Sequence, residues 1–540
     1  MFCYQCSQTK GGKGCDAVGV CGKTPETAAL QDLLLFTLKG LAAADNRSRR
    51  EGVKHSKVGP FTLSALFSTL TNVNFDSERL VKLIHEATEL RNEIRRSSGG
   101  DFSPALDYQP PKDAPSLVRD GESHGIEDGT DPLTLSLRET TIYGLKGLAA
   151  YVHHAARLGR EDDSLYAFVS ALLEKSLDPN LKAADWLDLA LETGKFNYLA
   201  LELLDKANRD AFGVPGPAPA RLRRVKGPAI LVSGHDLKDL LDLLEQTKGT
   251  DVKVYTHSEM LPAHGYPKLR AFPHLAGHFG TAWQNQAGEL KNFPGPVLFT
   301  TNCLKKPAAE KFPHTFVTGP AAWPSVNRIE EDASGFKDFS PLIRLARELG
   351  GFARDEDEGS VLTGFGHQAV LGLAGKIVEA VKTGAVKGFL LVGGCDGPEK
   401  ERDYYRELVN LAPRDVVILT LACGKFRFSD LDLGDAGGIP RYVDLGQCND
   451  AYSAIQIALA LAEAFKTDVN SLPLRLTLSW FEQKAVAILL TLLHLGVKNI
   501  RLGPNLPAFL HPEALKTLNE KFNLAPISTA GEDLLNLFAV

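Results

Sequence analysis

After residue 228 the sequence alternates between short apolar runs and amphipathic segments, and this alternation limits the folds open to the chain. The runs are rich in Val, Ile, Leu and Phe, as in PAILVSG (228–234) and GFLLVGG (388–394). Segments with helical spacing of apolar residues lie between them, such as HDLKDLLDLLEQT (235–247). Strands that alternate with helices form parallel sheets, so we expect α/β domains here. The other expected strands are 251–257, 296–302, 314–320, 415–422, 441–446, 474–480 and 499–504.

The first 212 residues have a different pattern, in which apolar residues recur at helical spacing. The hexapeptide LKGLAA occurs at 38–43 and again at 145–150, which indicates two related helical bundles. A stretch rich in Pro, Asp and Gly (97–116) is typical of a linker or long loop, and residues 212–228 form a second boundary. The clearest expected helices are 25–47, 77–96 and 137–159.

These patterns predict a multidomain α and α/β fold class, with an N-terminal helical-bundle domain followed by two α/β domains that contain parallel sheets. A chain of 540 residues is too long for one hydrophobic core. An acidic loop (353–360) and a helix (368–384) separate the two α/β regions. We therefore expect domains at 1–225, 226–375 and 376–540.

The charge balance and the start of the chain favour a cytoplasmic protein. With 60 basic and 66 acidic residues the net charge is −6, so no basic excess suggests a nucleic-acid or membrane partner. No signal peptide opens the sequence, and the longest apolar run, AVAILLTLLHLGV (485–497), is too short to span a membrane and is typical of a buried helix. In a reducing compartment the eight cysteines are better explained as metal ligands or catalysts than as disulfides.

Four of these cysteines are Cys3, Cys6, Cys15 and Cys21, with the spacing C-x2-C-x8-C-x5-C. Four thiolates within so short a segment satisfy one tetrahedral zinc ion or one iron–sulfur cluster, and the intervening glycines allow the chain to wrap around it. The spacing matches neither the common ferredoxin run nor the paired knuckles of a zinc ribbon, so a structural zinc site stays open as an alternative. A thioredoxin-like redox pair fits less well, because no βαβ unit surrounds Cys3 and Cys6.

The other four cysteines, Cys303, Cys395, Cys423 and Cys448, each lie just past an expected strand. In parallel sheets, ligands bind beyond the carboxyl ends of the strands. A free cysteine is a common core residue, and that explanation is sufficient for any one of them. The shared placement of all four favours a common site.

Three further residues, His235, Glu259 and Glu482, share this placement. A single His or Glu at a helix start is usually a cap or a surface group, and Glu482 can simply favour the helix dipole. Combined with four cysteines, they provide soft sulfur together with harder nitrogen and oxygen. Such a donor set suits a mixed iron site that leaves an iron position open for a small substrate.

Several unrelated motifs in fixed order make this sequence resemble the hybrid-cluster (prismane) protein family over its whole length. The motifs are MFCYQC, STLTNVNFD (68–76), SGHDLKDL (233–240), VYTHSEMLPAHGYP (254–267), TNC (301–303), GGCDG (393–397), LACGKFRF (421–428), QCNDAYSA (447–454) and SWFEQKA (479–485). The resemblance implies a helical domain and two Rossmann-like α/β domains with a hybrid cluster between them.

The resemblance also implies the cofactors. The four N-terminal cysteines match the ligands of a proximal cluster, and their short spacing is that of family members with a [4Fe-4S] cubane, whereas a longer insertion accompanies [2Fe-2S]. A hybrid [4Fe-2O-2S] cluster is implied as well, with Cys395 as a persulfide. Its matching ligands are His235, Glu259, Cys303, Cys395, Cys423, Cys448 and Glu482.

The implied activity is hydroxylamine reduction, NH2OH + 2e⁻ + 2H⁺ → NH3 + H2O, by an oxidoreductase. The residues expected to act in catalysis are Glu482, Lys484, Glu259 and His235. Lys484 is a candidate proton donor, but a buried salt-bridge role explains it equally well. The other candidate donors are Glu259, Glu482, His257 and His264.

Other activities stay open. Nitric oxide reduction or detoxification needs only the same open iron, and a non-enzymatic NO sensor or transnitrosylase would use the cluster or the Cys395 sulfur as acceptor. Chemistry like that of carbon monoxide dehydrogenase needs more cysteine ligands than remain. No G-x-G-x-x-G follows a strand, since GFGHQAVLG (364–372) has the wrong spacing, so we expect no bound nucleotide or flavin. Electrons then come from an external protein, an NADH-linked iron–sulfur flavoprotein or a ferredoxin.

Overall fold

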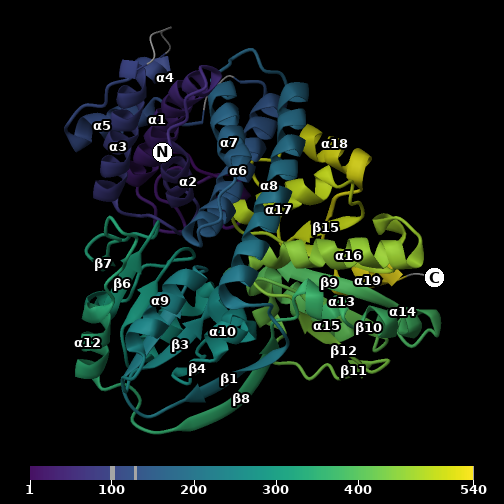
Figure 1. Cartoon of the computed structure of the whole chain (residues 1–540). Coiled ribbons are helices and arrows are strands. Elements are labelled where there is room, and N and C mark those ends of the chain that lie inside the picture. Colours follow the sequence, from purple (N-terminus) through teal and green to yellow (C-terminus); the bar gives the residue numbers. More distant parts are fainter. Residues whose placement is uncertain (98–103, 127–129, 539–540) are drawn as a thin grey trace.

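The computed structural model describes residues 1–97, 104–126 and 130–538. Helices make up its first part, and two six-stranded sheets with their helices make up the rest, which confirms the predicted fold class. The helical part lies above the two sheets in the view of Figure 1, and the sheets lie side by side below it. The boundaries after residues 225 and 375 stay predictions.

The helical part contains both copies of the LKGLAA hexapeptide, in α1 and α6, and residues of both helices belong to one hydrophobic core. The predicted linker lies partly outside the described residues, and its remainder is more ordered than expected. Pro104 begins α4, and Asp113 caps α5 by accepting a hydrogen bond from the backbone N–H of Ser116. The prolines fit because proline is well tolerated in the first turn of a helix. The helices are α1 (Pro25–Arg50), α2 (Val58–Ser68), α3 (Ser77–Ser97), α4 (Pro104–Asp107), α5 (Ala114–Glu122), α6 (Pro132–Arg157), α7 (Asp163–Lys175) and α8 (Ala183–Phe212).

Among the described helices, α1 alone has the length and apolar composition needed to cross a membrane. However, 78 % of its most apolar 18-residue stretch is buried inside the protein. The hydroxyl of Thr24 caps its first turn, and Pro25 is its first residue. These features are those of a helix at the centre of a protein core.

Each large sheet is parallel throughout, as the alternating pattern predicts. The central strands are buried on both faces, which explains their nearly continuous apolar runs. The first sheet has the order β4 (Leu275–His278), β3 (Lys253–His257), β2 (Ala229–Ser233), β5 (Val297–Phe299), β6 (Thr315–Thr318) and β7 (Asn327–Ile329). The second has the order β13 (Tyr442–Asp444), β10 (Val416–Thr420), β9 (Gly388–Gly394), β14 (Leu474–Ser479), β15 (Ile500–Gly503) and β16 (Ala525–Pro526).

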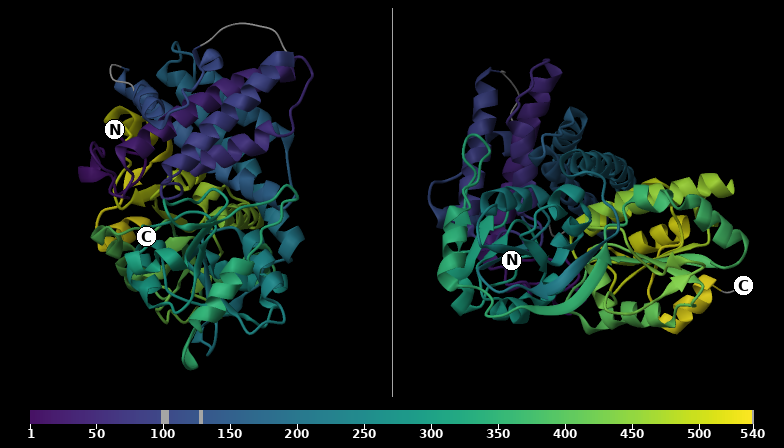
Figure 2. Two further views of the ribbon diagram at one scale, coloured as in Figure 1. Left: turned by 90° about the vertical axis from the view of Figure 1, so that its left-hand side faces the viewer. Right: turned by 60° about the horizontal axis from the view of Figure 1, so that its bottom comes forward.

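The predicted acidic loop at 353–360 is wrong over most of its length, because residues 356–360 belong to strand β8 (Glu356–Thr363). This strand pairs antiparallel with β1 (Ala218–Arg224) in a two-stranded ribbon along the lower edge of the molecule (Figures 1 and 2). Much of β8 is exposed, and Arg224 forms ion pairs with Glu356 and Glu358. Cross-strand ion pairs replace the apolar pattern that normally indicates a strand.

Helix α17 (Gln483–His494) packs closely against α6 and α8, and two glycines allow this approach. A Cβ atom on Gly147 would lie 2.4 Å from the backbone oxygen of Gln483, and one on Gly194 would lie 2.1 Å from that of Leu490. Because α17 follows strand β14, this packing fixes the helix start at the edge of the second sheet. The predicted buried helix over 485–497 is confirmed for residues 485–494, since α17 ends at His494.

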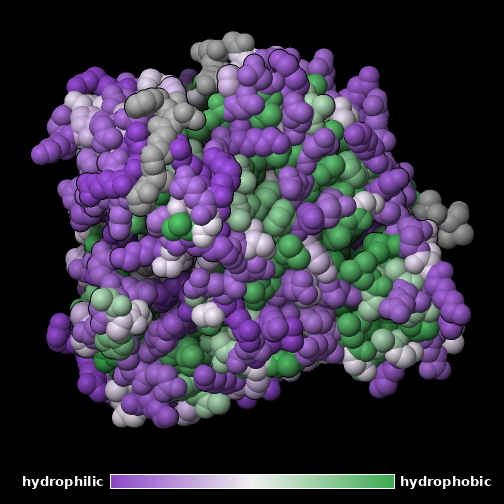
Figure 3. All heavy atoms as spheres, turned by 45° about the horizontal axis from the view of Figure 1, so that its top comes forward, coloured by the Kyte–Doolittle hydropathy of each residue, from purple (hydrophilic) through white to green (hydrophobic). Residues whose placement is uncertain are grey.

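The remaining helices cover the sheets. The surface in Figure 3 is mainly hydrophilic, with hydrophobic residues gathered in patches on its right half. The longer of these helices are α9 (Leu237–Thr247), α12 (Ser340–Leu349), α14 (Ala374–Lys382), α15 (Asp403–Leu411), α16 (Ala451–Phe465), α18 (Pro512–Phe522) and α19 (Ala530–Phe538). The shorter ones are α10 (Pro267–Arg270), α11 (Gln286–Glu289) and α13 (His367–Leu371).

Candidate functional site

The seven residues proposed from the sequence all follow the carboxyl ends of strands, and the contacts described below connect them in one buried region between the two sheets. In parallel sheets this edge is where ligands bind. From the first sheet come His235 after β2, Glu259 after β3 and Cys303 after β5; from the second come Cys395 after β9, Cys423 after β10, Cys448 after β13 and Glu482 after β14.

Three of the seven meet in a compact group of possible metal ligands. The Nε2 atom of His235 lies 3.6 Å from Oε2 of Glu259, and the backbone N–H of Cys448 donates to the same oxygen at 2.9 Å. The ligand atoms of the three residues lie within 4.8 Å of one another. Glu259 therefore joins a loop of the first sheet to a loop of the second.

Glu482 and Cys303 join the group through Asn302, whose amide nitrogen donates to Oε1 of Glu482 at 3.2 Å and lies 3.7 Å from the Cys303 sulfur. The ammonium of Lys484 donates to the side-chain oxygen of Asn302 and to Nε2 of His235, each at 3.0 Å. Glu482 also caps α17 by accepting from the backbone N–H of Lys484. The cap hypothesis for Glu482 is therefore confirmed, and its role as a cluster ligand stays a prediction.

The remaining cysteines line the same region. Cys303 and Cys395 pack against a small cluster formed by Cys423, Trp283 and Phe481, together with Ala282. The Cys423 sulfur lies 3.3 Å from the hydroxyl oxygen of Ser258. Aromatic rings on this side limit the entry of water.

Burial is the main electrostatic influence on these thiols. It raises the pKa of Cys395 to about 12, with Glu482 and Cys448 adding to the effect, and it raises the pKa of Cys448 to about 12 as well. Burial, reinforced by neighbouring acidic groups, also raises the pKa values of Cys303 and Cys423 well above the usual range. Four thiols crowded with two carboxylates cannot all ionise unless a cation joins them, as a metal would.

The imidazole of His235 is held in a form that can bind a metal. Burial lowers its pKa well below the usual value, and the nearby charge of Lys484 lowers it further. Its Nδ1 lies 3.1 Å from the hydroxyl oxygen of Thr301. If Nδ1–H donates there, the lone pair of Nε2 points toward Lys484 and Glu259, and a metal-binding histidine is commonly oriented by such a hydrogen bond from its other ring nitrogen.

One observation tests whether the residues fit a bound metal group. Oε1 of Glu259 is buried and has no hydrogen-bond partner within the part of the chain that the structure describes. A buried carboxylate oxygen without a partner is costly, and a metal ion satisfies it. The combined donor set of sulfur, imidazole nitrogen and carboxylate oxygen fits iron.

The four N-terminal cysteines lie in one short loop. Cys3 and Cys15 exchange two backbone hydrogen bonds of 3.0 and 2.8 Å, which brings the first pair of cysteines to the third. Burial and the neighbouring Cys3 and Cys21 raise the pKa of Cys6. All four are free thiols. A compact four-thiol loop fits an iron–sulfur cluster or a zinc ion by donor chemistry.

This loop contacts the segment that carries Glu482. The backbone N–H of Ser7 donates to the backbone oxygen of Phe481 at 3.0 Å, and the side chain of Gln483 donates to the backbone oxygen of Gln5 at 2.8 Å. In the left-hand view of Figure 2 the N-terminal loop lies beside the C-terminal segments, although they are at opposite ends of the sequence. The two cysteine groups are therefore neighbours.

Sequence reasoning missed Arg402, which links the two groups. Its fully buried guanidinium donates to the Ser7 hydroxyl at 2.8 Å and to the backbone oxygen of Cys395 at 3.3 Å. It also forms an ion pair of 2.6 Å with Glu399. No sequence signal identified it, because an arginine that precedes a helix is usually exposed. Asn302 was visible only as part of the quoted TNC motif.

The two histidines suggested as proton donors have other partners. His257 bonds with Ser233 at 2.9 Å and with Glu289 at 3.1 Å, and His264 bonds with Thr256 at 2.9 Å. Both side chains are therefore engaged within the first α/β region, and their proton roles stay predictions.

Fold and site together define a class of protein. It has one helical part and two parallel β-sheets, and cysteine, histidine and glutamate side chains lie just after the carboxyl ends of the strands, between the two sheets. The chain belongs to the Prismane/CO dehydrogenase family, whose sequence model matches residues 1–535. Membership implies iron–sulfur clusters.

Curated relatives resemble the chain over its full length. A hydroxylamine reductase of Solidesulfovibrio magneticus is 51% identical over 539 residues, and one of Syntrophobacter fumaroxidans is 50% identical over 542 residues; each alignment covers 99% of both chains. Among solved structures, carbon monoxide dehydrogenase IV of Carboxydothermus hydrogenoformans is similar with a TM-score of 0.55 at 14% identity, covering 97% of this chain and 89% of that one. At that identity the likeness concerns the fold alone.

Proposed function

We propose that the chain is a hydroxylamine reductase, which reduces NH2OH with two electrons and two protons to NH3 and H2O. The observation that carries this proposal is the convergence of seven side chains from the two sheets on one buried site with mixed donor chemistry. The activity named for relatives of about half identical sequence supports it.

We assign a hybrid [4Fe-2O-2S] cluster to the seven side chains, with Cys395 as a persulfide, and a [4Fe-4S] cluster to the four N-terminal cysteines. When bound, the hybrid group supplies an open iron that polarises the N–O bond and delivers electrons to it. The hydrogen bonds between the N-terminal loop and the segment around Glu482 support electron entry through the N-terminal cluster.

The protein itself supplies protons and orientation. Burial lowers the pKa of Lys484, but Cys448 and Glu482 raise it more, so its Nζ stays protonated. Nζ lies 3.0 Å from Nε2 of His235, so a substrate bound next to this ligand comes within reach of the lysine. Lys484 then donates a proton to the departing oxygen, as a general acid. Glu259 and Glu482 are further proton carriers, and burial raises the pKa of Glu259.

The electron donor is a separate protein, and we place its contact at the N-terminal loop. Cys3 and Cys21 are partly exposed there, and the apolar side chains of Phe2, Val18 and Val20 are about half exposed. An NADH-linked iron–sulfur flavoprotein or a ferredoxin is the expected donor, in the cytoplasm.

The test combines composition, spectroscopy and turnover. Anaerobic purification should give about eight irons per chain, EPR signals of two distinct clusters, and ammonia from hydroxylamine with a chemical reductant. Zinc in place of iron, or iron-loaded protein that forms no ammonia, would disprove the proposal.

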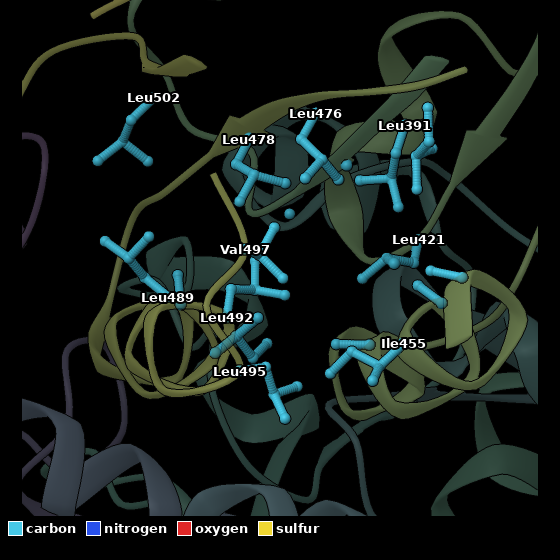
Figure 4. Close-up of a pocket in the computed structure, with 18 of the residues that line it drawn as sticks. Leu391, Leu421, Ile455, Leu476, Leu478, Leu489, Leu492, Leu495, Val497 and Leu502 are labelled. Carbon is cyan, nitrogen blue, oxygen red and sulfur yellow. The ribbon is translucent and has the colours of Figure 1, made fainter. Parts of the chain in front are cut away.

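Nitric oxide reduction is the second candidate, and one cavity favours it. A cavity of about 130 Å³ lies between α16 and α17 on one side and β9, β14 and β15 on the other (Figure 4). Leu476, Leu478, Leu489 and Leu492 face it. Gly394, directly before Cys395, is also among its lining residues. Its almost wholly apolar lining suits a small uncharged molecule better than a polar one.

Comparing the two substrates in one variant separates these candidates. Ala454 lines the cavity, and Ala454→Phe should fill much of it. If nitric oxide reaches the site through this cavity, kcat/KM of the variant for nitric oxide falls severalfold, while kcat/KM for hydroxylamine does not. An equal change for both substrates would remove the support that the cavity gives.

A further inference from the structure

A polar cavity of about 420 Å³ lies beside the N-terminal cysteines, between α1 and α6. It is lined by Cys3, Lys23, Asp32, Lys39 and Lys146, among other residues. The two LKGLAA copies explain part of this lining: each lysine of the repeat lines the cavity, and each following glycine makes a close backbone contact. A Cβ atom on Gly40 would lie 2.2 Å from the backbone oxygen of Ala105, just as Gly147 approaches Gln483.

Two of the lysines are almost completely buried. Lys23 and Lys146 are each 6% exposed. Within the described parts of the chain, neither forms an ion pair of 4.0 Å or less with a carboxylate. Among the described residues, the ammonium of Lys23 has one hydrogen-bond partner, the sulfur of Cys3 at 3.9 Å, and the Nζ atom of Lys146 lies 5.9 Å from the centre of the Tyr143 ring. Buried lysines are rare unless an opposite charge compensates them.

Lys23 lies directly beside the cysteine loop: its ammonium is 3.9 Å from the Cys3 sulfur, and it stands two residues after Cys21. Burial lowers the pKa of Lys146 to about 8, and the charge of Lys23 adds to this effect, whereas Asp32 and Glu139 on the same cavity oppose it. The two ammonium groups therefore repel each other, and these carboxylates offset the repulsion only in part.

A cluster held by four thiolates provides further negative charge. A [4Fe-4S] centre with four cysteines carries two net negative charges when oxidised and three after it accepts one electron from the donor. Two lysine cations balance the oxidised form, and they stabilise the reduced form more, because its charge is larger. Cluster potentials depend on net charge and on nearby polar groups in this way.

We propose that Lys23 and Lys146 are the countercharge of the N-terminal cluster and make it easier to reduce by the one electron that enters from the donor. Asp32, on the same cavity, acts in the opposite direction. The inference rests on the proposed function, because it requires an iron–sulfur cluster at these cysteines. The lysines are positioning residues, since they touch neither the substrate nor the hybrid cluster.

The experiment is an anaerobic redox titration of the N-terminal cluster, followed by EPR, at pH 7.5, which lies between the pKa values of Asp32 and Lys146, so that both side chains are mostly charged. For a charge about 10 Å away at an effective dielectric constant of about 20, Coulomb's law predicts roughly a tenfold change in the ratio of reduced to oxidised cluster at fixed potential. For one electron this is a shift of about 59 mV. Lys146→Met should lower the midpoint potential by this order, and Lys146→Arg should restore it.

Two further variants distinguish an effect of charge on the potential from a purely structural effect. Asp32→Asn removes a negative charge from the same cavity and should raise the midpoint potential. Lys195→Met is the matched control, because Lys195 is exposed and also lies over an aromatic ring, that of Phe196 at 5.7 Å. It should leave the potential unchanged.

The outcomes separate this inference from the proposed function. If Lys146→Met and Asp32→Asn have the wild-type midpoint potential and full iron content, the countercharge proposal is wrong, and the reductase proposal is unaffected. If the midpoint potentials of the two variants shift in the same direction, the countercharge proposal is also wrong, because removing a positive and a negative charge should shift the potential in opposite directions. If the wild-type protein has no iron–sulfur signal from the N-terminal cysteines, both proposals fall.

Discussion

The ammonium nitrogen of Lys484 lies 3.0 Å from Nε2 of His235, although the two residues are 249 positions apart in the sequence. His235 follows a strand of the first sheet, and Lys484 lies in the first turn of the helix that follows a strand of the second. The contact places a cation among side chains that are otherwise anionic or neutral. Lys484 is 1% exposed, so its charge depends on these neighbours.

Replacement of this lysine should impair turnover more than cluster binding. In Lys484→Met we expect kcat for hydroxylamine to fall by about 10²–10⁴-fold, the usual contribution of a positioned general acid. Iron content should stay near the wild-type value, because Lys484 is not a proposed ligand. Lys484→Arg keeps the charge and should recover part of the rate. A rate unchanged in the methionine variant, with full iron, would leave Lys484 only a salt-bridge role with Glu482, 3.7 Å away.

The two cysteine groups should be separable by single substitutions. Cys448→Ser removes a thiol from the group that contains His235 and Glu259, whereas Cys6→Ser removes one from the N-terminal loop. We expect each variant to lose the EPR signal of one cluster, and about half of the iron. If either substitution abolishes both signals in folded protein, the groups form one coupled unit instead of two sites.

How much the sequence predicts depends on what a residue contacts. The runs around β9 and β10 are buried on both faces, so their composition alone indicates strands, and the residues just after them follow from topology. Strand β8 was missed because it is exposed and stabilised by ion pairs. Lys146 and Arg402 were also missed, because lysine and arginine in helical sequence normally face solvent. Their burial depends on contacts with segments far away in the sequence.

A close helix contact should control the position of Glu482. A Cβ atom on Gly147 would lie 2.4 Å from the backbone oxygen of Gln483, so Gly147→Ala should push α17 away from α6. We expect a loss of unfolding free energy of about 1–3 kcal/mol from overpacking, and a lower iron content. The matched control is Gly375→Ala in α14, where a Cβ atom meets nothing within 4 Å. Urea unfolding should show this variant to be as stable as the wild type or more stable. Equal stability of the two variants would contradict the contact.

A buried ion pair stabilises the loops that carry Cys423 and Cys448. Lys425 and Asp444 are both fully buried, and Nζ of Lys425 lies 2.6 Å from Oδ1 of Asp444. Lys425→Met should cost about 3–5 kcal/mol in urea unfolding, because it leaves the Asp444 carboxylate buried without its cation. The control is Lys387→Met, which breaks an exposed pair of 2.8 Å with Asp415 and should cost about 0–1 kcal/mol. A small loss in both variants would show that the buried carboxylate finds other partners.

The cavity beside the N-terminal cysteines should make stability depend on pH through Asp32. Burial raises the pKa of this carboxyl to about 7, although Lys23 and Lys146 oppose the shift. Between the unfolded pKa, near 4, and this folded value, the unfolded chain releases a proton that the folded chain keeps. The contribution of Asp32 to the unfolding free energy therefore decreases as pH rises through this window and is constant above it.

Asp32→Asn removes this contribution, so the variant should gain stability relative to the wild type as pH rises from 5 to 8. The side chain is only partly buried and faces a cavity that can hold water, so we expect a gain of about 1 kcal/mol instead of the full linkage value. Urea unfolding at both pH values measures it, and the comparison with the wild type at each pH cancels the titration of groups that do not interact with Asp32. A difference between the two proteins that is constant with pH would show that Asp32 is ionised throughout. Its negative charge would then offset part of the charge of the two buried lysines at pH 5 as well, and not only above pH 7.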